Sequence, residues 1–418
     1  MPNRDTFLLI LLTILGAVSV SAQPLFSLHR ALQTAKSNNP FLKKDQFNIN
    51  IAESDIVTAQ LRPNPILNNQ SLQLVKSSVY PNDSKWSNAS NRQVWWQLTK
   101  PVQLPKQRQY KIEIATQNAQ VAQKSYIEAE RNLFQATAVK WLDVWAQRKQ
   151  LDILQSAKKN IDTLVTINKL RLKSEVISET DFVRTELLAN QYLLQIKSAE
   201  REYQNALNEL KLLIGTQDEI QIDTTDQFSY SFPDSFNELL QQALSARSDL
   251  DVLESTIDAT KTNIKLQKAL ALPQPELGII YNPQNTMPYL GIYGTVDLPF
   301  FSRNQGEIKK SYFFKQQAEQ YLDAARRQVQ TELTNAYTTY QTQRQNVQDF
   351  TKVLQQSQDI LNKVRYAYLR GGTSIIDFLE AQRSWLDTQQ QYYDTLRQFR
   401  SSYIQLLYTS GLIHQLAQ

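Results

Sequence analysis

Hydrophobic and small residues follow a heptad pattern over most of this chain. Residues 106–214 contain neither glycine nor proline, and apolar or small side chains recur there at alternating spacings of four and three: Ala115, Ala119, Ala122, Tyr126, Ala129, Leu133 and Ala136. This spacing is typical of helices that pack as coiled coils. Residues 307–370 and 373–410 show the same helical composition. A helix of about 60 residues would be about 90 Å long, so the pattern predicts an elongated helical protein.

Four short segments alternate between apolar and polar residues instead. They are residues 66–75, 92–100, 275–282 and 289–300, and they lie in the two zones where prolines cluster. In the last segment the apolar positions are Leu290, Ile292, Val296, Leu298 and Phe300. Such alternation predicts strands, either of a half-buried soluble sheet or of a transmembrane barrel, and the pattern alone favours neither.

The second half of the chain repeats the first. Asp181 matches Asp377 at an offset of 377 − 181 = 196 positions, and Gly215 matches Gly411 at the same offset. An amphipathic segment opens each half, at residues 27–42 and 235–250. Each half is therefore predicted to contain a helix, two strands and a long helical hairpin.

The N-terminus predicts export. Arg4 precedes an apolar run and the small residues Ser21 and Ala22, which together indicate a signal peptide cleaved after Ala22. The predicted organisation is a signal peptide at 1–22, a first repeat at 23–215, a linker at 216–234 and a second repeat at 235–418.

Composition excludes several kinds of site. The chain has no cysteine and two histidines, and it lacks Gly-rich phosphate loops and nucleophile motifs. A formal net charge of +5 is distributed with acids and bases intermixed, which favours solvated helix faces over a nucleic-acid surface. The sequence predicts no enzyme activity, no cofactor, no metal site and no nucleic-acid partner.

Four strands are too few to close a barrel, and open sheet edges are not tolerated in lipid. If these strands enter a membrane, several copies of the chain must share one barrel. The alternative is a soluble periplasmic coiled-coil scaffold with a small sheet at one end.

Several motifs carry a family resemblance. NNPFL (38–42), LRPNPIL (61–67), VDLPFFSRNQGEI (296–308) and YLRGGTSIIDFLEAQ (368–382), together with Gly411, resemble the TolC-like outer membrane efflux proteins. The likeness covers essentially the whole mature chain and recurs in both halves. Within the family, the LRPNP and PFFSRNQG segments are most similar to the branch that serves heavy-metal efflux pumps of the cobalt-zinc-cadmium type.

The resemblance implies an α+β membrane protein in the outer membrane of a Gram-negative bacterium. Long coiled-coil hairpins would form a periplasmic tunnel, and three chains with four strands each would form a twelve-stranded β-barrel. The implied partners are two further copies of the chain, outer membrane lipid, a periplasmic adaptor and an inner-membrane pump of the RND type. The implied function is a passive exit duct for heavy-metal cations. The alternatives are drug efflux or type I protein secretion by the same fold.

The resemblance also implies where such a duct opens and closes. The hairpins are expected to reverse near residues 173–178 and 370–373. Asp181 and Tyr368 match the family's closing network. Asp377 and Glu380 match acids that form a constriction, where a threefold ring of carboxylates would favour cations. Asp377 could instead stabilise the start of its helix through the helix dipole.

The turn of the second hairpin is expected to dock the adaptor. Gly371 and Gly372 would allow the left-handed backbone of a tight turn, and they would let a partner approach closely, beside Thr373 and Ser374. Thr373 stands where the best-known members place an arginine of the gate.

A further set of residues is expected where strands join helices. It comprises Pro101, Pro299, Ser302, Arg303, Asn304 and Gly306. Ser302 with Gln305, and Asn304 with Glu307, have the spacing of capping boxes, which predicts a helix start at this point.

Overall fold

The computed structural model describes residues 25–81, 84–226, 235–284 and 287–417. The predicted signal peptide and residues 227–234 of the predicted linker lie outside this part. The described chain forms two compact units, one from the described parts of 1–40, 131–239 and 333–418, and the other from those of 41–130 and 240–332. Both units draw on both halves of the sequence. We call them the turn unit and the sheet unit.

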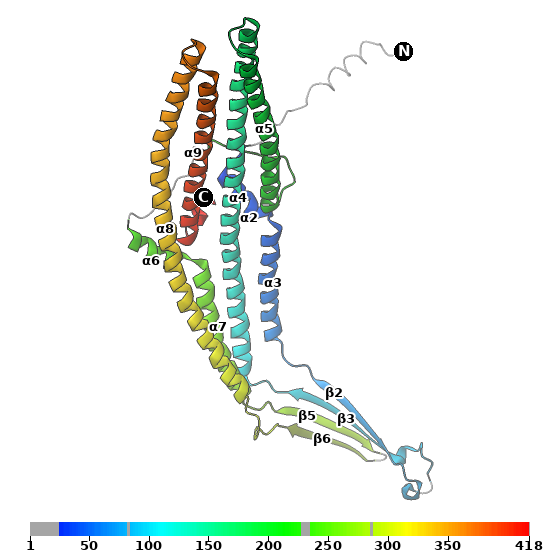
Figure 1. Cartoon of the computed structure of the whole chain (residues 1–418). Coiled ribbons are helices and arrows are strands. Elements are labelled where there is room, and N and C mark those ends of the chain that lie inside the picture. The colour runs from blue at the N-terminus through cyan, green and yellow to red at the C-terminus, as the bar shows by residue number, and fades with distance from the viewer. Residues whose placement is uncertain (1–24, 82–83, 227–234, 285–286, 418) are drawn as a thin grey trace, which may run out of the picture. The chain divides into compact units, whose positions relative to one another are not determined.

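The same order of elements occurs in each half (Figure 1). The first half contains α2 (Leu28–Asn38), α3 (Pro40–Gln60), β2 (Ile66–Gln73), β3 (Arg92–Pro101), α4 (Pro105–Lys173) and α5 (Glu179–Ile214). The second contains α6 (Phe236–Ala246), α7 (Ser248–Leu270), β5 (Glu276–Gln284), β6 (Met287–Thr295), α8 (Gln305–Leu369) and α9 (Ile375–Thr409). Two short strands, β1 (Leu25–Phe26) and β4 (Gln221–Ile222), pair in parallel within the turn unit.

Each half has two helices before its strands, where the sequence predicts one. The first ends because Pro40 follows: a residue before proline is driven out of the helical region, and Asn39 has an extended ψ of 123°. Pro40 then starts α3, a position that proline tolerates. In the second half, Arg247 has a ψ of 119° and separates α6 from α7. The α3 helix lacks a strong apolar stripe, and Leu42 is its one fully buried residue.

The sheet unit contains one antiparallel sheet in the order β2-β3-β5-β6. The central pair, β3 with β5, joins the two halves, with Leu98 opposite Ile279. The predicted strand at 289–300 is too long, since β6 ends at Thr295. Thr295 is paired with Glu276, the first residue of β5, so no partner strand remains beyond it.

Cross-strand register separates two faces of this sheet. One is apolar and exposed, and we call it the apolar sheet face: Leu67, Trp96, Leu98, Leu277, Ile279, Tyr281, Leu290 and Ile292. Ile292 is 89% and Leu290 78% exposed. The opposite face is mainly polar, and on it the hydroxyl groups of Thr99 and Tyr293 are hydrogen-bonded. The predicted alternation of the strands is therefore confirmed.

The turn unit has a continuous hydrophobic core. Side chains from all four long helices contribute to it, among them Leu154, Ile161, Leu188, Tyr192, Leu361, Phe378, Leu379 and Leu386. On α9, Leu379, Leu386 and Leu407 lie on one seven-residue column and are buried. Arg400 occupies this column too, and its guanidinium lies 4.3 Å from the ring centre of Trp145. No helix in the described part of the chain combines the length and apolar content needed to cross a membrane.

Candidate functional site at the hairpin turns

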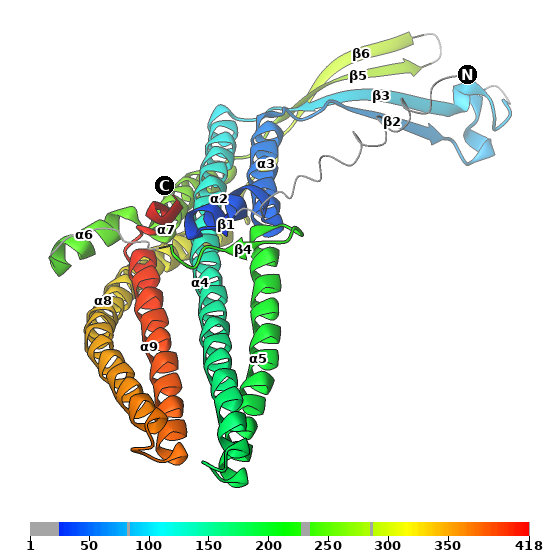
Figure 2. The ribbon, with the colours of Figure 1, turned by 90° about the horizontal axis from the view of Figure 1, so that it is seen from above.

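The two hairpin turns share one backbone design. They lie at the same end of the turn unit (Figures 1 and 2). Gly371 has a left-handed φ of 79°, and Glu175, its match 196 positions earlier, has a φ of 58°. The next amide in each turn, of Gly372 and Val176, donates back to a carbonyl of the preceding helix at 2.8 and 2.9 Å. Both turns therefore end their helices with a Schellman-type cap.

The two glycines of the second turn have different roles. Of the two glycines, only Gly371 has the left-handed backbone that the sequence predicts for both. A Cβ atom on Gly372 would lie 3.5 Å from the carbonyl oxygen of Ala367, which is ordinary contact. Both residues are exposed.

Gly371→Ala is expected to destabilise the protein by about 1 kcal/mol, because an L side chain is strained in the left-handed region. Gly372→Ala, the matched control, is expected to change stability by less than about 0.5 kcal/mol. Glu175→Gly should relieve the same strain in the first turn and raise stability. The check is the thermal unfolding midpoint by circular dichroism in detergent. Equal shifts for the two glycine variants would contradict the assignment.

Asp377 caps the last long helix. Its amide donates to Ser374 Oγ at 3.2 Å, and its carboxylate accepts from the Ser374 amide at 3.2 Å, which together form a capping box. The carboxylate also accepts from the hydroxyl groups of Ser374 and Thr373, each at 2.7 Å. These hydrogen bonds, led by the one from the Ser374 hydroxyl, lower the pKa of Asp377. The cap therefore contributes stability above the unfolded-state pKa and loses it as the pH falls.

Asp181 has the matching position in the first hairpin. Its amide donates to Ser178 Oγ at 3.1 Å, so Ser178 caps α5 as Ser374 caps α9. Its carboxylate lies 3.9 Å from the guanidinium of Arg184 on the same helix. Glu380 is exposed one turn beyond Asp377. Asp377 thus completes the cap of α9, whereas the Asp181 carboxylate contacts Arg184 within α5, and Ser178 caps that helix.

Tyr368 is buried and linked to the other hairpin. It is 3% exposed, and its hydroxyl donates to Asn168 Oδ1 at 2.7 Å. Asn168 Nδ2 donates to Thr185 Oγ1 at 2.9 Å, and Thr185 donates to the carbonyl of Asp181 at 3.0 Å. Tyr368 therefore reaches the backbone of Asp181 through two intermediate side chains, and in a single chain it makes no direct bond to the Asp181 carboxylate.

Asn168 and Thr185 are site residues that sequence reasoning missed. Both are fully buried. Asn168 continues the seven-residue column of Leu154 and Ile161, so a polar residue in an apolar column was the available signal. Tyr368 itself stacks on Phe378, with ring centres 5.3 Å apart.

The strand-to-helix junction is held by side-chain hydrogen bonds. Asn304 has a left-handed φ of 56° and donates to the carbonyl and side-chain oxygens of Gln267 at 2.8 and 2.9 Å. Arg303 Nε donates to the carbonyl of Pro299 at 3.1 Å, and the Arg303 amide donates to Gln305 Oε1.

The capping boxes predicted at this junction are wrong. Among the described residues, neither Ser302 nor Asn304 makes the side-chain bonds of such a box, because Gln305 bonds Arg303 and Asn304 bonds Gln267 instead. Of the other predicted junction residues, Pro101 ends β3, and a Cβ on Gly306 would meet no atom within 4 Å.

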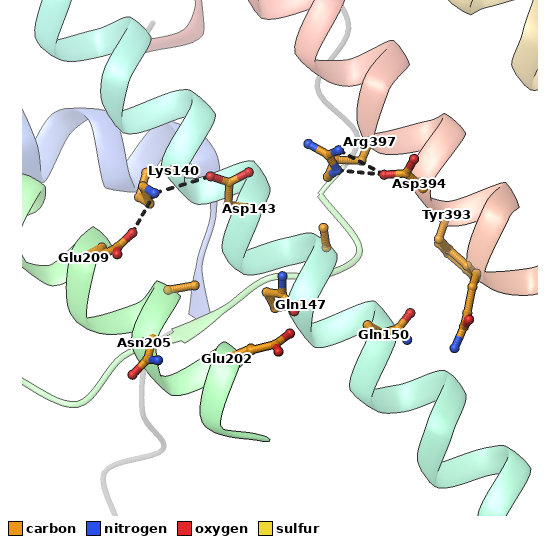
Figure 3. Close-up of a pocket in the computed structure, with 13 residues that line it drawn as sticks. Lys140, Asp143, Gln147, Gln150, Glu202, Asn205, Glu209, Tyr393, Asp394 and Arg397 are labelled. Carbon is orange, nitrogen blue, oxygen red and sulfur yellow. Dashed lines mark hydrogen bonds and ion pairs between the residues drawn. The ribbon is translucent and has the colours of Figure 1, made fainter. Parts of the chain in front are cut away.

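A polar cavity of about 690 Å³ lies between α4, α5 and α9 (Figure 3). Its cations face its own carboxylates: Lys140 Nζ is 2.7 Å from Glu209 and 3.4 Å from Asp143, and Arg397 bonds Asp394. The hydrogen bond to Glu209 raises the pKa of Lys140. Two cations and four carboxylates line the cavity, so its lining carries a negative formal net charge. Among the described residues, no cluster of three or more possible metal ligands occurs.

Comparison with known proteins defines the class to which this fold and these turns belong. The model of the outer membrane efflux protein family matches residues 31–216 and 239–411, one match in each half. The chain therefore belongs to this family of outer membrane channels, which is not a family of enzymes. A comparison with curated proteins finds no match.

Solved channel structures share the fold. CusC, described with conformational changes that accompany folding and transmembrane channel formation, is 18% identical with a TM-score of 0.77, over 92% of each chain. The Campylobacter jejuni outer membrane channel CmeC is 15% identical with a TM-score of 0.74, over 95% of this chain and 91% of its own. The open state of the Neisseria gonorrhoeae outer membrane channel MtrE is 17% identical with a TM-score of 0.74, over 92% and 89%.

Proposed function

We propose that this protein is the outer membrane exit duct of a tripartite efflux pump and conducts its substrate passively. The observation that carries the proposal is the apolar sheet face, exposed on a four-stranded sheet in a chain of the outer membrane efflux protein family. An exposed apolar face of this kind suits contact with lipid. The aromatic residues Trp96 and Tyr281 stand on this face, are 43 and 44% exposed, and fit the interfacial girdles of such a barrel.

The sheet edges support a homotrimer. Within the described residues, β2 and β6 each pair on one side only. Unpaired backbone groups are costly in lipid, so the edges need partners from other copies of the chain. Three copies would supply twelve strands, with β6 of one chain beside β2 of the next. The long helices would then form a periplasmic tunnel that leads to the barrel.

The turn end of the helices is the proposed contact with the pump. Gly371, Gly372, Thr373 and Ser374 are largely exposed and sit where two hairpins end together. A periplasmic adaptor would dock at these turns and connect the duct to an inner-membrane pump of the RND type. Opening and docking would be the tasks of this chain, and energy would come from the pump.

For the substrate we propose heavy-metal cations. Support comes from the LRPNPIL and PFFSRNQGEI segments, which resemble the cobalt-zinc-cadmium branch, and from Asp377 and Glu380, whose exposed carboxylates lie on one face at the turn end. Deletion of the gene is expected to sensitise cells to zinc, cobalt and cadmium ions. Sensitivity to drugs alone, or loss of a secreted protein, would favour the drug-efflux or secretion alternatives.

The duct is tested by extraction and by conductance. The mature protein is expected to require detergent, to migrate as a trimer, and to open ion-conducting pores in planar bilayers. A monomer that stays soluble in buffer without detergent would refute the duct and favour the periplasmic scaffold.

Glu380→Gln and Asp377→Asn are expected to lower cation selectivity in planar bilayers, measured as the reversal potential in a salt gradient. Each removes one negative charge per chain, three per trimer, from the turn end. Asparagine keeps an oxygen that accepts hydrogen bonds, so Asp377→Asn separates a pore role from the helix cap. Glu53→Gln, an equal charge change at an exposed position of α3, is the control. Unchanged selectivity in both turn variants would leave Asp377 as a helix cap only.

A further inference from the structure

A second cavity lies in the sheet unit, where β2 and β3 connect to the helices. Its volume is about 670 Å³. The charged residues that line it are all basic: Arg62, Lys100 and Arg108. The remaining lining residues are uncharged and include Val102, Ile112 and Leu277. We call it the basic cavity.

The three cations lack carboxylate partners. None of them makes an ion pair with a residue that the structure describes, and residues 100–111 contain four basic and no acidic side chains. Arg108 donates one guanidinium N–H to the carbonyl of Gln60 at 2.9 Å, while its Nε is buried without a hydrogen-bond partner. Pro105, the first residue of α4, also lines the cavity, so the positive end of a helix dipole faces it. The charges around the cavity therefore favour binding of an anion.

The basic cavity continues the apolar sheet face. Lys100 is paired in register with Leu277, and both stand on the face that carries Leu98 and Ile279. Leu277 belongs to the cavity wall as well as to the apolar sheet face. A ligand with an apolar tail along the strands could thus place an anionic group among Arg62, Lys100 and Arg108.

The corresponding junction of the second half lacks this charge pattern. Pro101 and Pro299 match at an offset of 299 − 101 = 198, which places Leu298 at the position of Lys100 and Gly306 at that of Arg108. Acidic Asp297 and Glu307 flank the second junction. The basic cavity is therefore particular to the first half and does not follow from the duplication.

We propose that the basic cavity binds the phosphate of an anionic glycerophospholipid headgroup, with the acyl chains along the apolar sheet face. This inference rests on the proposed function, since it requires the sheet to be in a membrane. Basic pockets at a membrane surface recognise such headgroups, and each nearby lysine or arginine strengthens the attraction. In a barrel, the site would lie at the level where strands leave the lipid for the helical part.

The test compares two triple variants of the full chain, purified in detergent. Arg62→Gln with Lys100→Gln and Arg108→Gln removes the cations of the basic cavity. Arg303→Gln with Lys309→Gln and Lys310→Gln removes the same charge at the second junction. Native mass spectrometry follows the binding of dioleoylphosphatidylglycerol, with dioleoylphosphatidylcholine and inorganic phosphate as the comparison ligands.

The cavity variant is expected to weaken phosphatidylglycerol binding about tenfold or more, and the control variant by less than about twofold. Phosphatidylcholine should bind weakly to all three proteins. Equal losses in both variants would overturn the site in favour of general charge attraction. If inorganic phosphate at the same concentration displaces the lipid, the lipid proposal is overturned and the cavity is a site for free anions. Conductance of the cavity variant in bilayers separates the lipid site from the proposed duct. If the variant conducts ions and its lipid affinity is unchanged, only the lipid site is refuted.

Discussion

Arg247→Ala is expected to lower the free energy of unfolding by about 3 kcal/mol. The Arg247 side chain is 5% exposed and donates to Asp249 at 2.6 and 3.0 Å and to Glu332 at 2.7 Å. Burial alone would lower the pKa of Arg247, but its hydrogen bonds to the two carboxylates outweigh burial and raise it. The guanidinium therefore stays charged, and its removal leaves two carboxylates close together. The unfolding midpoint by circular dichroism in detergent measures the effect.

Arg326→Ala is the matched control for this prediction. Arg326 bonds Glu254 at 2.9 Å, but the two side chains are 49 and 52% exposed, so its loss should cost less than about 1 kcal/mol. Each arginine makes an ion pair that links α8 to α7 or to the residue just before it, and both pairs lie within the sheet unit. Similar midpoints for the two variants would show that the Arg247 pairs contribute no more than a surface ion pair.

Asn168→Ala is expected to destabilise the turn unit by about 2 kcal/mol, because it leaves the buried hydroxyl groups of Tyr368 and Thr185 without one partner each. Tyr368→Phe keeps the stacking on Phe378 and should cost about 1 kcal/mol. The double variant should cost less than the sum, since both changes break one network. Thermal unfolding checks all three. Asn160→Ala, at an exposed position of the same helix, should be nearly neutral.

The same variants test the proposed duct. The Tyr368–Asn168–Thr185 network joins α8 to the other hairpin at the turn end, so breaking it should increase the closed-state conductance in planar bilayers. A destabilised protein with unchanged conductance would restrict this network to packing.

Much of the fold was predictable from local patterns. Strand faces were correct because successive side chains of a strand point to opposite sides, whatever the partner strand is. The helical hairpins and their turns were correct because glycine, proline and heptad spacing act over a few residues. The end of β6 was not predictable, since it depends on where β5 begins. Helices α3 and α7 were missed because their apolar faces are weak, and α3 fully buries only Leu42.

The candidate site was likewise predictable from the sequence only in part. Ser374 and Asp377 form their capping box within one helical turn. The sequence predicted a stabilising position for Asp377 at the helix start but not this box, and the same spacing at Ser302 and Asn304 gives no box. The partner of Tyr368 lies 200 positions away in the sequence, and no local pattern relates it to Asn168. Offset matching between the halves placed Asp181 near the turn but could not show that its carboxylate bonds within its own helix.

By itself, the sequence determined the long helices, the strand faces, the duplication and the family, because each of these depends on short-range periodicity or on motifs that recur at a fixed offset. Only the tertiary structure decided that Tyr368 is tied to Asn168, that Arg247 is buried between carboxylates, and that Arg62, Lys100 and Arg108 line one cavity. Those arrangements join residues tens to hundreds of positions apart. Burial and charge pairing at such distances are set by how the elements pack, and the packing exists only once the chain has folded.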